Sequence, residues 1–378
     1  MGTPTPHAHA VVHLDAVAHN TALFAAATDA AVLAVVKADG FGHGAVRVAG
    51  AALAAGATWL GVTTCAEALQ LRAGGITAPI LSWLHGPLED FSAALLAGVD
   101  LSVSAREQLR AVAACAARLG VTAEVHLKAD TGLHRNGARP EEWPELVRLA
   151  RDLAAVGLVR VRGIWSHLVS TAGDTTRAQV RLFDEAVEVA RGAGLRPPLR
   201  HLANSAATLG APRTHYELVR PGIGIYGVEP DPRHDFGLRA AMTLRAQVIL
   251  TKRVPAGSGV SYEHDYVTDR ETTLALVPLG YADGLPRAAA RHAEVSIAGR
   301  RHPVAGRIAM DQFVVDVGDA TPRTGDEVVV FGPGAEGEPT VADWARWAGT
   351  LPHEILTGIG PRVPRRHVAT LTEELSLA

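Results

Sequence analysis

The sequence predicts an α/β protein made of two units: an N-terminal (β/α)8 TIM-type barrel in residues 1–236 and a mostly β C-terminal domain in residues 237–378. The chain of 378 residues exceeds the roughly 250–300 residues that one hydrophobic core usually supports. Short β-branched runs alternate with alanine-rich helical stretches through the first two thirds, which is typical of βα units around a parallel sheet. After about residue 236, strand-like runs instead follow one another through turns rich in glycine, proline and aspartate.

Candidate strands of the first unit number about eight, which is the number that closes a βα barrel. They are 32–36, 59–63, 80–84, 101–104, 123–128, 161–167, 199–204 and 218–220. Helices fit between them, as in the segment 105–119, where apolar residues recur at helical spacing after Ser104, the expected N-cap. Barrel enzymes build their active sites at the carboxyl ends of the strands, so residues at those ends are the first candidates for chemistry.

The second unit is expected to contain several strands and two short helices. The strand candidates are 274–278, 295–298, 313–317 and 327–331, and the helix candidates are 340–348 and 353–357. A leading strand at 10–14 is expected to pair back onto this domain.

The composition argues against several classes of partner. The 36 basic and 39 acidic side chains nearly cancel and are interspersed, so the chain lacks the basic patch of a nucleic-acid-binding protein. No stretch has the length and apolar character of a signal peptide or membrane span, and no metal site is expected. With only Cys65 and Cys115, a disulfide framework is implausible, and the sequence favours a cytoplasmic protein.

The string AVVKADGFGHG carries the first candidate for chemistry, Lys37. An apolar strand delivers this lysine to the carboxyl edge of the barrel, and a glycine-rich loop follows. A lone lysine at a strand end usually extends its ammonium group into water. In a desolvated cleft with nearby cations its amine would instead be neutral and able to attack an aldehyde cofactor.

Two further strand ends carry polar groups. The string EVHLKADTGLHRNG places Lys128, Asp130 and Arg135 at one of them, where they form either part of a site or a solvated charged loop. The string GIWSHLVSTA places His167 at the other, and a lone histidine is more often structural than catalytic.

The strings HLANSAAT and LVRPGIGIYG are candidates for phosphate binding. Asn204 and Ser205 precede a helix, where they either receive a phosphate or simply cap the helix. Gly222 permits close backbone approach, and Arg220 precedes a proline that fixes the direction of the chain.

The β domain opens with the string GSGVSYEHDY, which carries Tyr262. Taken alone, this residue reads as a turn tyrosine at a domain junction. Two later strings, PLGYADGLPR and AGRIAMDQ, supply Tyr281, Arg287, Arg307, Met310 and Asp311.

In this order and spacing, the strings resemble the motifs of alanine racemases, from about residue 11 to RVPR at 362–365. The resemblance implies an enzyme that uses pyridoxal 5'-phosphate to interconvert L- and D-alanine. It also implies the same barrel and β domain, and a homodimer with shared active sites. Lys37 would carry the cofactor and act as one base, and Tyr262 of the partner subunit would act as the second.

The resemblance also implies roles for the remaining candidates. Arg135 would contact the phenolic oxygen of the cofactor, Lys128 would be carbamylated and hold that arginine, and His167 would lie beside the cofactor. Arg220 would face the pyridine nitrogen and disfavour its protonation, so that the proton returns to Cα. The phosphate contacts would be Asn204, Ser205, Gly222 and Ile223. Substrate contacts would be Arg135, Met310 and Asp311, and the entrance would be lined by Tyr281, Arg287, Arg307 and His353.

Three positions depart from the family pattern. Phe41 and His353 stand where tyrosines that contact the phosphate are common, and Ala172 occupies an entrance position that is commonly acidic. These changes leave open a preference for serine or a broader set of amino acids, because a methylene or two is worth only about 1–3 kcal/mol in discrimination.

Two other functions are compatible with parts of this pattern. A pyridoxal-phosphate decarboxylase of similar architecture would use a late cysteine, whereas both cysteines here lie within the first 115 residues. A noncatalytic cofactor carrier or regulator would share the fold and the cofactor but show no exchange at the alanine Cα. The sequence leaves open whether the product serves cell-wall synthesis or a specialised pathway.

Overall fold

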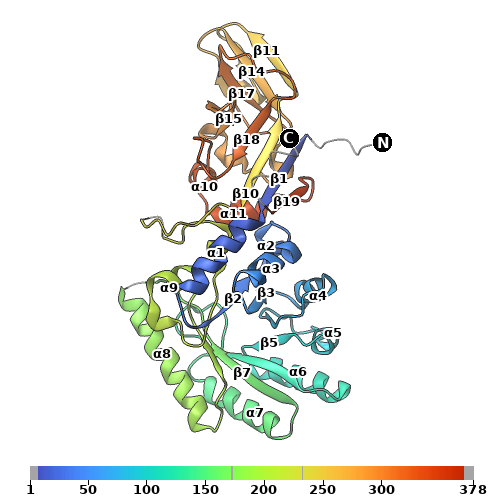
Figure 1. Cartoon of the computed structure of the whole chain (residues 1–378), viewed down its shortest axis with the longest axis vertical. Coiled ribbons are helices and arrows are strands. Elements are labelled where there is room, and N and C mark those ends of the chain that lie inside the picture. Colours follow the sequence, from blue (N-terminus) through green and yellow to red (C-terminus); the bar gives the residue numbers. More distant parts are fainter. Residues whose placement is uncertain (1–6, 172, 232, 370–378) are drawn as a thin grey trace.

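The computed structural model describes residues 7–171, 173–231 and 233–369. These residues form a barrel and a β-rich domain stacked end to end, as Figure 1 shows. The predicted departure at Ala172 lies outside the described residues. Within the described residues, no helix combines the length and the apolar character needed to cross a membrane.

The barrel contains the eight parallel strands that the alternating pattern predicts. Its order, β8-β7-β6-β5-β4-β3-β2-β9, is closed by a bridge between Asn204 and Arg220 at the ends of β8 and β9. The strands are β2 (Ala31–Val35), β3 (Trp59–Val62), β4 (Ile80–Ser82), β5 (Asp100–Val103), β6 (Ala123–Lys128), β7 (Val159–Trp165), β8 (Leu199–His201) and β9 (Leu218–Val219). Several end one to three residues earlier than expected.

Helices cover the outside of the barrel (Figure 1). They are α1 (Leu14–Ala26), α3 (Ala45–Ala54), α4 (Cys65–Ala73), α5 (Ser92–Leu96), α6 (Arg106–Leu119), α7 (Trp143–Ala155), α8 (Gly173–Gly192) and α9 (Ser205–Gly210). The short segment α2 (Lys37–Phe41) lies at the barrel mouth instead and contains residues with left-handed φ and ψ. The expected cap of α6 was wrong. Ala105 is the N-cap, and the Ser104 amide donates to the side chain of Gln108 at 2.8 Å, so the chain turns before the helix begins.

The second domain is mostly β, as its turn-rich sequence predicts. Its larger sheet has the order β16-β15-β18-β10-β1-β19, and two smaller sheets are β11-β14-β17 and β12-β13. Its elements are β10 (Met242–Gln247), β11 (Leu250–Val254), β12 (Gly259–Val260), β13 (Tyr266–Val267), β14 (Thr272–Val277), β15 (Glu294–Ile297), β16 (Arg300–Pro303), β17 (Phe313–Gly318), β18 (Glu327–Phe331), β19 (Arg365–Val368), α10 (Val341–Ala348) and α11 (Pro352–Gly358).

The leading strand β1 (Ala8–His13) belongs to this second domain. It pairs antiparallel with β10 and parallel with β19, and then continues directly into helix α1 of the barrel. Helix α11 packs on α2, which begins at the mouth of the barrel (Figure 1). The two domains therefore meet where the first sequence candidate, Lys37, is located.

Candidate active site

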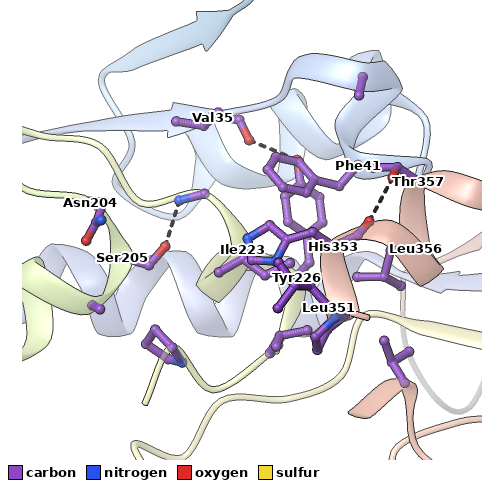
Figure 2. Close-up of a pocket in the computed structure, with 18 of the residues that line it drawn as sticks. Val35, Phe41, Asn204, Ser205, Ile223, Tyr226, Leu351, His353, Leu356 and Thr357 are labelled. Carbon is purple, nitrogen blue, oxygen red and sulfur yellow. Dashed lines mark hydrogen bonds between the residues drawn. The ribbon is translucent and has the colours of Figure 1, made fainter. Parts of the chain in front are cut away.

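A cavity of about 1420 Å³ opens at the carboxyl ends of the barrel strands and runs along the junction with the β domain. It brings together ten of the predicted site residues: Lys37, Lys128, Arg135, His167, Asn204, Ser205, Arg220, Gly222, Ile223 and His353. Figure 2 shows how Ser205 of α9, Ile223 and Tyr226 of the segment that follows β9, and His353 of α11 converge on this space. The cavity is therefore the candidate active site.

Lys37 stands two residues beyond β2, at the start of a left-handed turn. Ala38 and Asp39 both have φ of 52°, and the Ala38 amide donates to Glu67 at 2.7 Å. This geometry turns the backbone away and leaves the half-buried lysine side chain lining the cavity. Burial lowers the pKa of Lys37, Arg135 lowers it further, and Glu67 partly opposes the shift. The site therefore favours the neutral, nucleophilic amine.

Lys128 and Arg135 add two more nitrogen groups to the same side of the cavity. Lys128 is 3% exposed, its Nζ lies 4.0 Å from the centroid of the Trp165 ring, and it donates to Asn136 Oδ1. Burial, with smaller effects of Arg220 and Arg135, lowers the pKa of Lys128 to about 7. A large share of Lys128 is consequently neutral near physiological pH.

Arg220 is buried and held on three sides. Its Nη2 donates to the carbonyls of Ser166 at 2.8 Å and Leu202 at 3.1 Å, and its Nη1 donates to His201 Nδ1 at 3.2 Å. Burial lowers the pKa of Arg220 to about 9. The guanidinium thus presents a fixed cation to the cavity.

His167 lies two residues beyond β7 and is kept neutral. Burial lowers its pKa to about 3, and the cations Arg220, Arg135, Lys128 and Lys37 add to the shift. Its Nδ1 lies 3.5 Å from Arg220 Nη2. His167 can therefore offer a hydrogen bond to a ligand in the cavity but no positive charge.

Ser205 joins the two segments that were predicted to bind phosphate. Its Oγ accepts from the Gly222 amide at 2.8 Å (Figure 2) and from the Gly224 amide at 3.2 Å. Its hydroxyl hydrogen remains to donate, whereas the side chain of Asn204 caps α9 by accepting from the Ala207 amide at 3.0 Å. Ser205 and Ile223 are the better-placed donors here.

The two family departures that the structure describes lie together on one wall. Phe41 is 4.7 Å from Tyr226 and 6.0 Å from His353 between ring centroids. Burial, and to a smaller extent Lys37, lowers the pKa of His353. Figure 2 shows the His353 ring directed into the pocket beside Ile223 and Tyr226.

The remaining predicted residues form a second group on the β domain, outside the cavity. Tyr262 begins a short turn, and its side chain is 68% exposed. Ser261, Glu263 and His264 all have φ between 52° and 63°, a conformation that L-residues rarely adopt. Arg307 holds this turn through ion pairs with Glu263 at 2.7 Å and with Asp265.

Tyr281, Met310 and Asp311 lie beside that turn. The Tyr281 amide donates to the Ala309 carbonyl at 3.0 Å, and Met310 is 53% exposed. Asp311 pairs with Arg362 at 2.7 Å. Arg287 is exposed and lowers the pKa of Asp265, but more weakly than Arg307 does. We refer to Tyr262, Tyr281, Met310 and Asp311 as the β-domain cluster.

Three buried residues near Arg220 were missed by the sequence reasoning. Asp100, His126 and His201 form a hydrogen-bonded row inside the barrel that ends on Arg220. A signal was present, because His126 lies two positions before Lys128 and so faces the same side of its strand.

The lining of the cavity fits the cofactor that the sequence resemblance implies. An aldehyde reacts with a neutral amine, and the lowered pKa of Lys37 increases the fraction of that form. A phosphate requires donors, which Ser205 and the backbone at Ile223 offer, and Arg135 and Arg220 supply positive charge for the ring substituents. No group of three or more His, Cys, Asp or Glu side chains among the described residues is arranged to hold a metal ion.

Comparison with known protein families matches both parts of the chain. Residues 12–230 match the alanine racemase N-terminal domain, and residues 241–367 match the alanine racemase C-terminal domain. The alanine racemase of Frankia casuarinae is 55% identical over 367 residues, which cover 95% of this chain and 96% of that protein. The alanine racemase of Thermobifida fusca is 52% identical and covers 95% and 97% of the two chains.

Solved structures agree with this similarity. The alanine racemase from D-cycloserine-producing Streptomyces lavendulae superposes with a TM-score of 0.95 at 47% identity, covering 98% of this chain and 99% of that one.

Proposed function

The chain belongs to the alanine racemase family and catalyses the interconversion of L- and D-alanine, and we propose that it does so with pyridoxal phosphate and two bases. The strongest support for this mechanism is that Lys37, with a lowered pKa, shares one cavity with the buried cation Arg220. When bound, the cofactor acts as an electron sink that acidifies the Cα proton of alanine.

Lys37 binds the cofactor and then serves as the base for one face of the substrate. Its lowered pKa makes it easier for the ammonium to give up its proton and so for the amine to act as a base. In this scheme Lys37 acts on D-alanine, and Tyr262 acts on L-alanine from the opposite face. Inversion follows because one base removes the Cα proton from one face and the other base delivers a proton to the opposite face.

Arg220 directs where the proton returns. Hydrogen bonds to Ser166, Leu202 and His201 fix its guanidinium, so it stays cationic and disfavours protonation of the ring nitrogen beside it. Negative charge then remains on Cα, which is reprotonated to give the other enantiomer. Arg135 and Met310 are assigned to the substrate carboxylate pocket, with Asp311 beside them.

We propose a homodimer in which the β-domain cluster of one subunit completes the cavity of the other. The position of this cluster supports the arrangement, because its four residues do not line the Lys37 cavity of their own chain. The exposure of Tyr262 and Met310, at 68% and 53%, leaves their side chains available for a partner. Tyr281, Arg287, Arg307 and His353 are assigned to the entrance.

Lys128 is proposed to be carbamylated. Its neutral amine adds to carbon dioxide with loss of one proton, which gives an anion that would hold Arg135. The low pKa of Lys128, about 7, supports this step.

Finer assignments of context are also proposals. The barrel unit is assigned to residues 1–236 and the β domain to residues 237–378. Free, buried Cys65 and Cys115 are compatible with a reducing, cytoplasmic setting, in which D-alanine would supply cell-wall synthesis.

One exchange experiment tests the activity and the substrate together. Purified protein is supplied with pyridoxal phosphate in heavy water and offered L-alanine, D-alanine or L-serine, and deuterium at Cα and the enantiomer ratio are followed. We expect both alanine enantiomers to exchange and invert, with serine slower. Faster inversion of serine would assign Phe41 and His353 to a different specificity, and no exchange despite bound cofactor would indicate a carrier.

A further inference from the structure

A row of buried polar side chains connects Arg220 to a carboxylate deep in the barrel. Arg220 Nη1 lies 3.2 Å from His201 Nδ1, His201 Nε2 lies 2.8 Å from His126 Nδ1, and His126 Nε2 lies 3.1 Å from Asp100 Oδ2. Asp100 also accepts from Arg162 Nη1 at 3.1 Å. Asp100, His126 and His201 are 1%, 0% and 0% exposed, so water does not compete for these bonds. We call these three residues the histidine bridge.

The N–H groups of Arg220 determine which ring nitrogen carries the hydrogen in His201 and in His126. A guanidinium can only donate, so His201 Nδ1 must carry a lone pair. His201 Nε2 then carries the hydrogen and donates to His126 Nδ1, and His126 Nε2 donates to Asp100. Only one arrangement of neutral imidazoles satisfies all three bonds.

The packing around the bridge locks the rings. The His201 ring stacks on Trp165 at an interplanar angle of 8°, and His126 meets Trp59 edge-on at 5.7 Å. Gly163 makes room for this row, because a Cβ at that position would lie 2.3 Å from His126 Nδ1. Neither imidazole can simply rotate to find another partner.

Charges face the bridge from each neighbouring element. Arg220 and Lys128 approach His201, while Arg162 and Glu124 lie beside Asp100. Burial, together with Arg220 and Lys128, lowers the pKa of His201 well below its usual value. Among the described residues no carboxylate pairs directly with Arg220, so Asp100 is the anion at the far end of its hydrogen-bond network.

We propose that Asp100, acting through His126 and His201, is the positioning residue that keeps a lone pair facing Arg220 and so holds the guanidinium in its working orientation. The inference rests on the proposed function of Arg220 but adds residues outside the cavity lining. Its consequence is control over where the substrate proton returns.

The variant Asp100→Asn tests this because it reverses the bridge without changing its shape. Arg162 donates to Oδ1 of Asp100. In the variant it would donate to the only oxygen of the new amide, which would leave the NH2 group facing His126. His126 would then carry its hydrogen on Nδ1, and so would His201. A hydrogen on His201 Nδ1 would oppose the Arg220 N–H and remove that bond.

The double variant Asp100→Asn with Arg162→Gln gives a rescue. Without the Arg162 donor, the amide can turn its oxygen to His126 and restore the original proton positions. Arg162→Gln alone controls for loss of the surface ion pairs with Glu124. Asp316→Asn is a matched control, because Asp316 is also buried and hydrogen-bonded but lies in the β domain.

The first readout is structural and independent of turnover. Neutron diffraction of the wild-type protein with bound cofactor should place deuterium on Nε2 of His126 and His201 and none on Nδ1, and Asp100→Asn should reverse both. Deuterium on Nδ1 in the wild type, or unchanged positions in Asp100→Asn, would overturn the proposal even if the enzyme racemises alanine normally.

The second readout is the fate of the substrate. In the side reaction the proton goes to the cofactor carbon, the amino group stays on the cofactor, and water releases pyruvate. We expect pyruvate per racemisation event to rise at least tenfold in Asp100→Asn and to fall again in the double variant, with both controls unchanged. An unchanged ratio in a reversed bridge would also overturn the proposal, whereas a wild type that binds no cofactor would contradict only the proposed function.

Discussion

At the scale of single residues, the cavity contains several cationic side chains around Lys37, and Lys37 must itself be deprotonated to react with an aldehyde. Burial comes first in lowering the pKa of Lys37, Lys128 and His167, and Arg135 adds to the effect at each of them. An anionic, aldehyde-bearing ligand benefits twice, because the surrounding cations attract it and deprotonate its attachment point.

Replacing Arg135 should move the pH dependence of cofactor attachment. Arg135 lowers the pKa of Lys37, so Arg135→Gln should raise that pKa and shrink the neutral fraction of the amine at pH 7. The pH of half-maximal attachment, followed by absorbance of the bound cofactor, should therefore shift upward. Arg139→Gln, an exposed neighbour paired with Glu142, should leave the profile unchanged. A downward shift or none in Arg135→Gln would contradict this electrostatic role.

Removing the hydroxyl of Tyr262 should separate the two faces of the substrate. Tyr262→Phe should slow inversion by roughly 10²–10⁴-fold, the usual contribution of a general acid or base. Since the enantiomers have equal free energies, kcat/KM must fall equally in both directions. The Cα proton of D-alanine should nevertheless still exchange with heavy water through Lys37, while that of L-alanine should not. Equal exchange of both enantiomers would rule out Tyr262 as the second base.

At the scale of elements, the β-domain cluster depends on close backbone packing between two turns. Gly280 lies against the loop that carries Met310, and a Cβ there would lie 2.3 Å from the carbonyl oxygens of both Ala309 and Met310. The Tyr281 and Ala282 amides donate to those same carbonyls. Only glycine permits this approach, so the position of Met310 follows from a residue thirty positions earlier in the chain.

The substitution Gly280→Ala should damage the cluster and leave the barrel cavity intact. The added Cβ must push the Met310 loop away, which should cost about 1–3 kcal/mol of stability and lower turnover well beyond any loss of cofactor binding. Thermal unfolding, cofactor titration and racemisation together measure these effects. Gly50→Ala, where the new Cβ meets nothing within 4 Å, should retain full activity. Normal turnover in Gly280→Ala would mean that the loop is not part of the site.

The periodicity of the sequence predicted the elements better than their ends. All eight barrel strands and both late helices are present, because alternating β-branched and alanine-rich runs report burial directly. The cap of α6 was wrong by one position: the helix is capped by Ala105, which has no side-chain oxygen to accept a hydrogen bond and so leaves no capping signal in the sequence.

The site residues that could be predicted from the sequence are those at the ends of the barrel strands and in the motifs that resemble the family. Lys37, Arg135 and Arg220 were found in this way and line one cavity. The histidine bridge was not found, because its bonds join residues 26 and 75 positions apart that only closure of the barrel brings together.

At the scale of the whole molecule, one chain carries two groups of predicted site residues that do not meet. The Lys37 cavity lies at the mouth of the barrel, while Tyr262 and Met310 are exposed on the β domain and do not line it. The two packed domains hold these two groups apart, so a movement within one chain is a poor explanation of how they could form one site. A second copy, related by symmetry, can place its own β-domain cluster at the cavity of the first and receive the first chain's cluster at its own cavity.

Mixing two inactive subunits tests that arrangement without any structural measurement. Lys37→Ala and Tyr262→Phe should each be nearly inactive as homodimers. In a hybrid dimer, one site would combine both defects and the other would combine an intact Lys37 with an intact Tyr262 from the partner. Equal amounts, co-refolded to exchange subunits, should therefore regain about a quarter of wild-type activity, because half of the dimers are hybrids and half of their sites are intact. Sites built within one chain would stay defective in every dimer, so activity that never exceeds the sum of the two parents would exclude the shared site.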